Sequence, residues 1–202
     1  MSGLTRRRSI TAPSGELPLL TSRLLLRDFV RTDLPAVERL AAHPRVREHA
    51  PLESRALLVA RQATATQATP SQRAVRKSYE LAIINRRSHK LIGACDIARV
   101  GRTRADLGYM LLPRHWGFGY GTEVAKAMVQ FGFETMKLTE ITAIVATDNE
   151  GSRRVLMNAG FVWQGLVRRA IRVGARHWDC HQYTIDRARW LKHATPLKLK
   201  KR

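Results

Sequence analysis

The feature of this sequence that most constrains its fold is a short segment with glycine at three alternate positions. Gly117, Gly119 and Gly121 lie in the segment WGFGYGTE, residues 116–123. An apolar, strand-like run over residues 106–112 precedes the segment, and apolar residues at helical spacing follow it. Glycine lets the backbone turn sharply and approach a ligand closely. The segment therefore predicts a strand-to-helix turn whose backbone faces a bound molecule.

A helix that begins at this turn would present free backbone amides, and its dipole would favour a phosphate or diphosphate there. Two standard nucleotide motifs fit poorly. A P-loop requires Gly-Lys-Ser/Thr, but Gly121 is followed by Thr122 and Glu123. A dinucleotide fingerprint requires a third glycine where Thr122 stands, and it opens the first βαβ unit of a chain. A plain tight turn without a ligand is the alternative interpretation.

The periodicity of the rest of the chain predicts an α/β fold, with α+β mixing, around one sheet. Helices come first, then an antiparallel meander, then a strand–helix–strand–helix unit. Asp33 is a candidate N-cap for the first helix. The predicted strands cover residues 23–27, 79–84, 91–100, 106–112, 141–146, 167–173 and 177–185, and the predicted helices cover residues 34–41, 53–68, 124–136 and 152–159.

The length of 202 residues fits one domain. We expect a flexible lead over residues 1–20, one folded domain over 21–192 and a basic tail over 193–202. Two cysteines, Cys95 and Cys180, argue against a disulfide scaffold and favour a reducing, cytoplasmic location. No apolar run approaches the roughly 20 residues of a membrane helix, so we expect no membrane partner.

Charge separates the partner classes further. The chain has 36 Lys and Arg against 16 Asp and Glu, a net charge of +20. This balance indicates anionic partners such as phosphates, RNA or an acidic protein surface, although a generally basic protein surface would look the same. His177 and His181 flank Cys180, but no second cluster has matching ligand spacing. We therefore predict no metal site.

Two ordered blocks of the sequence resemble the GCN5-related N-acetyltransferases, the GNAT family. Residues 107–123 (LGYMLLPRHWGFGYGTE) are similar to the family's motif A, and residues 148–161 (DNEGSRRVLMNAGF) are similar to its motif B. The segments 22–27 and 178–183 resemble the branch of RimJ/RimL type, which contains ribosomal-protein N-terminal acetyltransferases. The resemblance covers about residues 20–190, in family order and spacing.

This resemblance implies a central mixed, mostly antiparallel sheet flanked by helices. It also implies acetyl transfer from acetyl-CoA to a primary amine by direct attack. Asn149 matches a family residue whose side chain binds the cofactor arm, or it is simply a helix cap. The strand that pairs with the pantetheine falls on Tyr109, Met110 and Leu111, and the pyrophosphate loop falls on Gly117, Phe118, Gly119, Tyr120, Gly121 and Thr122.

The acid–base residues depart from part of the family. Ile144 and Leu156 stand where some members have a Glu and a Tyr. By resemblance to the RimL-like branch, Ser152 would assist the leaving thiolate, and Asp106 would serve as a base directly or through water. Ser152 as an ordinary first-turn residue and Asp106 as a strand-end charge are the alternatives. A thioester is already activated, so positioning alone could suffice.

The resemblance favours a protein N-terminal α-amine as acceptor, and the basic surface suits an acidic or ribosomal partner. A small-molecule amine, such as an antibiotic, a polyamine or an amino acid derivative, is the alternative acceptor. A further alternative is a non-catalytic binding module with the same fold. Both a monomer and a homodimer are consistent with the sequence.

Overall fold

The computed structural model describes residues 17–48, 76–173 and 175–193. These residues form one eight-stranded sheet in the order β1-β2-β3-β4-β5-β6-β8-β7. All neighbouring strands are antiparallel except β5 and β6, which are parallel. The strands are β1 (Leu19–Leu20), β2 (Leu24–Asp28), β3 (Ser78–Asn85), β4 (Leu91–Val100), β5 (Arg104–Leu111), β6 (Glu140–Ala146), β7 (Val162–Val173) and β8 (Arg176–Asp186).

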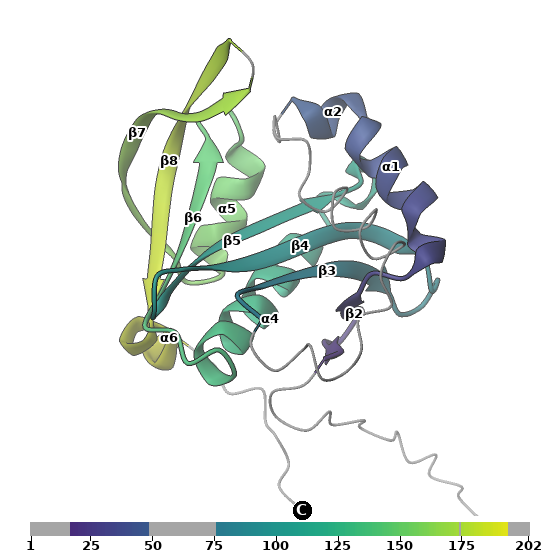
Figure 1. Cartoon of the computed structure of the whole chain (residues 1–202), viewed down its shortest axis with the longest axis horizontal. Helices are drawn as coiled ribbons and strands as arrows, with labels where there is room; N and C mark the ends of the chain where they lie inside the picture. Colours follow the sequence, from purple (N-terminus) through teal and green to yellow (C-terminus); the bar gives the residue numbers. More distant parts are fainter. Residues whose placement is uncertain (1–16, 49–75, 174, 194–202) are drawn as a thin grey trace, which may run out of the picture.

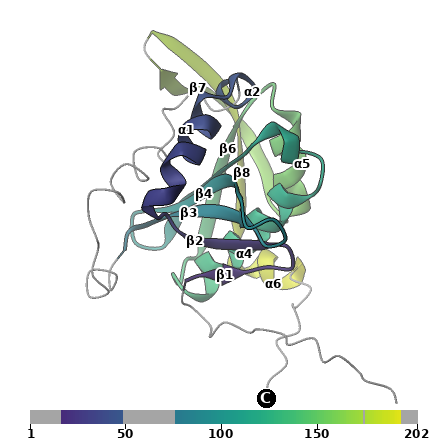
Figure 2. The ribbon, with the colours of Figure 1, turned by 90° about the vertical axis from the view of Figure 1, so that its right-hand side faces the viewer.

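Helices cover both faces of the sheet. One face of the sheet carries α1 and α2 near β2–β4, and the opposite face carries α4 over β4–β6 and α5 over β6 and β7 (Figure 1, Figure 2). Short 3-10 turns precede α1 and the glycine segment. The helices are α1 (Leu34–Ala42), α2 (Pro44–Arg47), α4 (Tyr120–Glu134), α5 (Glu150–Asn158) and α6 (Arg187–His193).

Alternation along the strands divides the core into two layers. In β5, Leu107 and Leu111 point into the larger core beneath α4 and α5, while Met110 packs with the smaller core beneath α1. In α4, Val124, Met128 and Phe131 recur at helical spacing and are buried. The helical face predicted from these positions is confirmed, and its packing fixes α4 against β5.

The predicted meander and the strand–helix–strand–helix order are confirmed, and several boundaries are corrected. Strand β7 begins at Val162 rather than at residue 167, because two register shifts in its pairing with β8 break the simple alternation. The predicted helix over residues 53–68 lies outside the described residues. Helix α6 is a short element that the sequence did not predict.

The ends of the domain and the first helix also differ in detail. Leu19 and Leu20 form β1 and pair with β2, so the last residues of the expected flexible lead belong to the sheet. Helix α1 begins directly after Asp33 as predicted, but the Asp33 carboxylate makes no capping hydrogen bond to α1. It accepts hydrogen bonds from the Arg27 guanidinium at 2.6 and 3.0 Å and from the Val30 N–H at 2.9 Å. Within the described ranges, no helix is both long and apolar enough to span a membrane.

Candidate active site

The parallel strands β5 and β6 pair over only three residues and then separate. Arg104, Ala105 and Asp106 pair with residues 140–142, and the C-terminal half of β5 diverges from β6 beyond that point (Figure 1). A cavity of about 600 Å³ lies at this splay. Segments from β5, from the glycine turn with the start of α4, and from the start of α5 line it: residues 109–111, 115–117, 119–121, 148–152, 154, 155 and 158, together with Val46 of α2.

Glycine serves two different purposes in the turn. Gly117 and Gly119 have φ values of +81° and +76°, which L side chains rarely adopt. Gly121 lies inside α4, and a Cβ there would be 3.1 Å from a Val155 methyl group of α5. The first two glycines therefore shape the turn, and the third lets α4 and α5 approach each other.

Helix α4 begins at Tyr120, and no side chain caps its N-terminus, where Gly119 is the N-cap residue. The backbone amides of the first turn therefore have no side-chain acceptor from the cap residue, and Gly119, Tyr120 and Gly121 line the cavity. Such a terminus favours an anion through both hydrogen bonding and the helix dipole.

A set of hydrogen bonds that we call the Glu123 cluster ties the start of the domain to this helix. The Glu123 carboxylate accepts hydrogen bonds from the Thr21 hydroxyl at 2.6 Å, the Ser22 hydroxyl at 2.9 Å, the Arg23 N–H at 2.9 Å and the Arg23 Nε at 2.7 Å. Arg23 also donates to the Phe118 carbonyl at 2.8 Å and stacks on the Tyr120 ring. Residues 100 positions apart thus brace the glycine turn.

The Glu123 cluster also sets the protonation of its carboxyl group. Partial burial raises the pKa of Glu123, but the hydrogen bonds from Thr21, Arg23 and Ser22 lower it, and the net shift is downward. Glu123 is therefore held as a carboxylate, pointing to the β1–β2 turn.

The three strand residues of the predicted cofactor site divide between the two faces of β5. Tyr109 and Leu111 face α4 and α5, and Met110 faces α1. The Tyr109 hydroxyl oxygen is buried, and in the described part of the structure it has no hydrogen-bond partner of good geometry. Burial raises the pKa of Tyr109 to about 12, while the neighbouring Ser152 hydroxyl acts in the opposite direction.

Helix α5 brings the second predicted block to the cavity. Asn149 is its N-cap residue, and its side-chain oxygen accepts a hydrogen bond from the Ser152 N–H at 3.0 Å. Both side chains belong to the cavity lining. The cap interpretation of Asn149 is thus confirmed, and a cofactor contact from the same side chain stays a prediction.

Of the predicted site residues, Asp106, Phe118 and Thr122 do not belong to the cavity lining. Asp106 is exposed and forms the last β5 pair before the splay, opposite Thr142. By alternation it lies on the α1 face of β5, on the side of the sheet opposite Ser152. Ile144 is 45% exposed, whereas Leu156 is fully buried, so the two positions that lack the family's Glu and Tyr face different environments.

Sequence reasoning missed several cavity residues. His115 and Trp116 belong to the lining, and Trp116 Nε1 donates to the Leu111 carbonyl at 2.7 Å. Partial burial, together with the Arg114 charge, lowers the pKa of His115. Both residues lie inside the recognised segment, so their nearness to the glycines was the available signal. No sequence signal indicated Val46, because only the fold brings α2 to the cavity.

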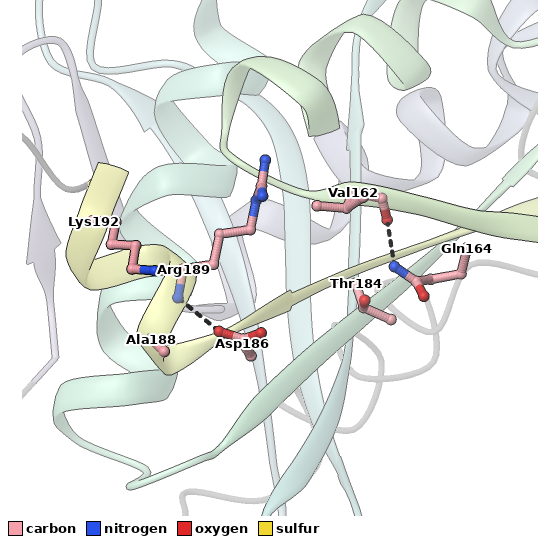
Figure 3. Close-up of a pocket in the computed structure, with 7 residues that line it drawn as sticks. All are labelled: Val162, Gln164, Thr184, Asp186, Ala188, Arg189 and Lys192. Atoms are coloured by element: carbon pink, nitrogen blue, oxygen red, sulfur yellow. Dashed lines mark hydrogen bonds between the residues drawn. The ribbon is translucent and has the colours of Figure 1, made fainter.

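A second, smaller cavity of about 330 Å³ lies between β7, β8 and α6 (Figure 3). In it, Asp186 caps α6 by accepting from the Arg189 N–H at 2.6 Å, and the Gln164 amide donates to the Val162 carbonyl at 3.3 Å. Its polar groups thus serve the local fold. None of the predicted site residues lies there.

Comparisons with known proteins agree with this geometry. Residues 23–162 match the family model described as Acetyltransferase (GNAT) domain. The chain is 29% identical over 178 residues to Uncharacterized N-acetyltransferase YoaA of Bacillus subtilis (strain 168), with 85% of this chain and 98% of that protein covered.

Solved structures show the same fold at low identity. The ribosomal-protein-S5-alanine acetyltransferase of Vibrio fischeri superimposes with a TM-score of 0.70 at 17% identity, over 85% of this chain and 97% of that one. The spermidine N-acetyltransferase of Vibrio cholerae, in complex with CoA and spermine, gives 0.68 at 19% identity, over 85% and 99%. The chain therefore belongs to the GNAT family of acetyltransferases, enzymes that draw their acetyl group from acetyl-CoA.

Proposed function

We propose that the acetyl acceptor is a protein N-terminal α-amine, and that acetyl-CoA lies in the cavity lined by β5, the glycine turn and the start of α5. The observation that carries the cofactor assignment is the splay, since it leaves an open strand edge next to an uncapped helix N-terminus. A pantetheine arm contains amides that pair with such an edge, and a diphosphate suits such a terminus.

The residues present fit this cosubstrate. Apart from Gly117 itself and its two chain neighbours, no residue of the described ranges has a heavy atom within 4 Å of where a Gly117 Cβ would be, so the turn has room for a ligand. The backbone amides of the turn, over Gly117, Phe118, Gly119, Tyr120, Gly121 and Thr122, would hold the diphosphate. The backbone of Tyr109, Met110 and Leu111 would pair with the arm, and the Asn149 amide would bond to it.

When bound, acetyl-CoA supplies an activated thioester carbonyl. A backbone N–H of the β5 edge would polarise that carbonyl and stabilise the oxyanion, the largest contribution in many acyl transfers. The Ser152 hydroxyl would donate toward the departing sulfur. Asp106 lies at the base of the splay, on the face of β5 opposite Ser152. Because of this separation, it would accept the proton of the acceptor amine through water rather than directly.

Support for a protein acceptor comes from charge. A polyamine or a cationic antibiotic carries several positive charges and favours an acidic host, whereas this chain has a net charge of +20. A basic surface suits an acidic or ribosomal partner instead. The same fold occurs in a ribosomal-protein-S5-alanine acetyltransferase and in a spermidine N-acetyltransferase, so the fold itself accommodates either acceptor class.

A thiol-release screen tests the acceptor assignment. Acetyl-CoA is supplied with peptides of varied N-termini, with aminoglycosides and with polyamines, and free CoA thiol is measured. We expect release with a subset of the peptides and none with the cations. Release with a polyamine or an aminoglycoside alone would replace the proposed acceptor with a small molecule. Tight acetyl-CoA binding without turnover on any acceptor would instead support a binding module.

A further inference from the structure

The β7–β8 hairpin carries a group of exposed arginines near its tip. Figure 1 shows this hairpin extending past the ends of the neighbouring strands. Near the tip, the side chains of Arg168, Arg169 and Arg172 are all exposed. Residues 162–179 contain four arginines, no lysine and one acidic residue, Asp179. Guanidinium groups bind phosphates through paired N–H donors and also stack on bases, so this composition favours a phosphate-bearing partner.

Local geometry gathers two of these arginines at one histidine. Arg172 lies directly opposite His177 in the register of the hairpin. A bulge in β7 brings the Arg169 guanidinium to the same ring, with Nη2 3.3 Å from His177 Nε2. Arg169 has a φ of +53°, and the Asp179 carboxylate holds this rare conformation by accepting from the Arg169 N–H at 2.7 Å. The fold thus keeps cationic groups together at a strained position, as is common at binding sites.

Trp163 presents an aromatic ring on the same face of the hairpin. It lies opposite Tyr183, which is six residues from His177 along β8. Since side chains alternate along a strand, this even separation puts Trp163 and Arg172 on one face, about 20 Å apart. Trp163 is 54% exposed, and its Nε1 donates to His181 Nδ1 at 3.1 Å. The hydrogen bond fixes the indole and leaves much of it open to a partner.

The combination of arginines with a fixed aromatic ring separates the classes of anionic partner. An acidic peptide would satisfy the arginines but makes no particular use of an exposed indole. Duplex RNA is recognised mainly by its shape, and its bases stay stacked. A single strand uses both features, because its phosphates contact cationic side chains and its bases stack on aromatic ones.

We propose that Trp163, Arg168, Arg169 and Arg172, which we call the hairpin surface, bind single-stranded RNA. The arginines contact phosphates and a base stacks on Trp163, so binding does not depend on base sequence. The surface is separate from the acetyl-CoA cavity, whose lining includes none of these residues. RNA is chosen over DNA because the proposed acceptors include ribosomal proteins, and that choice alone rests on the proposed function.

Fluorescence anisotropy with the full chain tests the arginines. The probe is a labelled RNA strand of about 20 nucleotides that cannot self-pair, titrated at several salt concentrations. The triple variant Arg168→Gln/Arg169→Gln/Arg172→Gln should lose about 100-fold in affinity at about 0.1 M salt. The slope of log K against log salt should shrink by about 2, since each phosphate contact on a single strand contributes about 0.7.

A second triple variant is the matched control. Arg87→Gln/Lys90→Gln/Arg102→Gln removes the same charge from exposed residues in the turns after β3 and β4. Its affinity should fall by no more than about threefold. An equal loss in the two variants would assign RNA binding to overall charge and would overturn the hairpin surface.

Arg168→Gln alone guards against a misfolded hairpin. Arg168 makes no hydrogen bond or ion pair with any residue that the structure describes, so its replacement leaves the contacts of the hairpin in place. The unfolding temperature should stay unchanged while the salt slope shrinks by about 0.7. An unchanged slope in a folded variant would contradict the phosphate contact.

Trp163→Leu tests the stacking contact separately. We expect about a tenfold loss of affinity at an unchanged salt slope, because stacking releases no counterions. Full affinity in this variant, or tighter binding of poly-glutamate than of RNA, would replace RNA with an acidic protein partner. Tighter binding of a DNA strand of the same sequence would overturn the choice of RNA. Absence of RNA binding by the unaltered protein would overturn the whole proposal and leave the acetyl-CoA site untouched.

Discussion

Two helices point their N-termini at the same cavity, and the two termini are built in opposite ways. Helix α4 begins after Gly119 with no capping side chain, whereas helix α5 begins after Asn149, whose side chain accepts from the Ser152 N–H. At α4 the first-turn amides stay open to a ligand. At α5 one amide is already used, and the cavity receives side chains instead. From this difference we expect α4 to bind the cofactor through its backbone amides and α5 to take part in the reaction through its side chains.

Closing the open terminus of α4 should have the largest effect. Gly119→Asp places a carboxylate at the N-cap, where it caps the helix and repels the diphosphate. We expect acetyl-CoA affinity to fall by about 100-fold or more, measured by calorimetry. Gly119→Asn is the matched control, since it has the same shape without the charge and tolerates a positive φ. Equal losses in the two variants would assign the effect to shape, and unchanged binding would refute the assignment of the turn.

Releasing the brace on the same terminus should have the next largest effect. Glu123→Gln replaces a carboxylate that accepts four hydrogen bonds, so the free energy of unfolding should fall by about 1–3 kcal/mol in a urea titration. Glu134→Gln is the control, because it makes the same change in the last turn of α4, where Glu134 accepts one exposed hydrogen bond. A similar loss in both variants would remove the special role of the Glu123 cluster.

The same pair of proteins predicts a pH dependence. The pKa of Glu123 is lower in the folded state, so ionised Glu123 contributes its full stability above the unfolded value of about 4.3. That contribution is lost as the pH falls through the lower folded value. The stability difference between the unaltered protein and Glu123→Gln should therefore be constant near neutrality and shrink below about pH 4. A difference that grows in acid would contradict the sign of this pKa shift.

Removing a side chain from the capped terminus should change chemistry rather than binding. Ser152→Ala should lower kcat by about tenfold, the value of one hydrogen bond to a charged sulfur, with acetyl-CoA affinity nearly unchanged. Single-turnover kinetics would separate the chemical step from product release. Full activity in this variant would exclude Ser152 from the mechanism.

Opening the capped terminus should have the smallest effect. Asn149→Ala loses the bond to the Ser152 N–H and should cost about 1 kcal/mol of stability. Asn149→Ser restores a capping oxygen but lacks the amide. If Asn149 also binds the cofactor arm, the Ser variant should recover stability without recovering affinity for acetyl-CoA. Recovery of both would leave Asn149 with the cap alone.

The contrast between the two termini also explains what the sequence could predict. The glycines at positions 117 and 119 indicate positive φ values, since few other residues tolerate them. The spacing of Val124, Met128 and Phe131 indicates the buried face of α4. Both are local signals. The open terminus of α4 was therefore predictable before any coordinates.

The rest depends on distant parts of the chain. Glu123 binds residues about a hundred positions earlier, and nothing in their local pattern indicates that pairing. The two register shifts in β7 moved its start away from the predicted position. The burial of the Tyr109 hydroxyl follows from the packing of three elements, so the sequence indicated only that its backbone belonged to the site.

The short joint between β5 and β6 has a mechanical consequence. Strands β1–β5 form one part of the sheet and strands β6–β8 form the other, and only three residue pairs between β5 and β6 join the two parts. A ligand whose amides form hydrogen bonds along the gap takes the place of a paired strand. Ligand binding should therefore reduce local opening across the whole sheet rather than in one pocket alone. Amide hydrogen exchange of Ala143 and Val145, which lie in β6 beyond the residues that pair with β5, should slow on loading even where no ligand atom touches them.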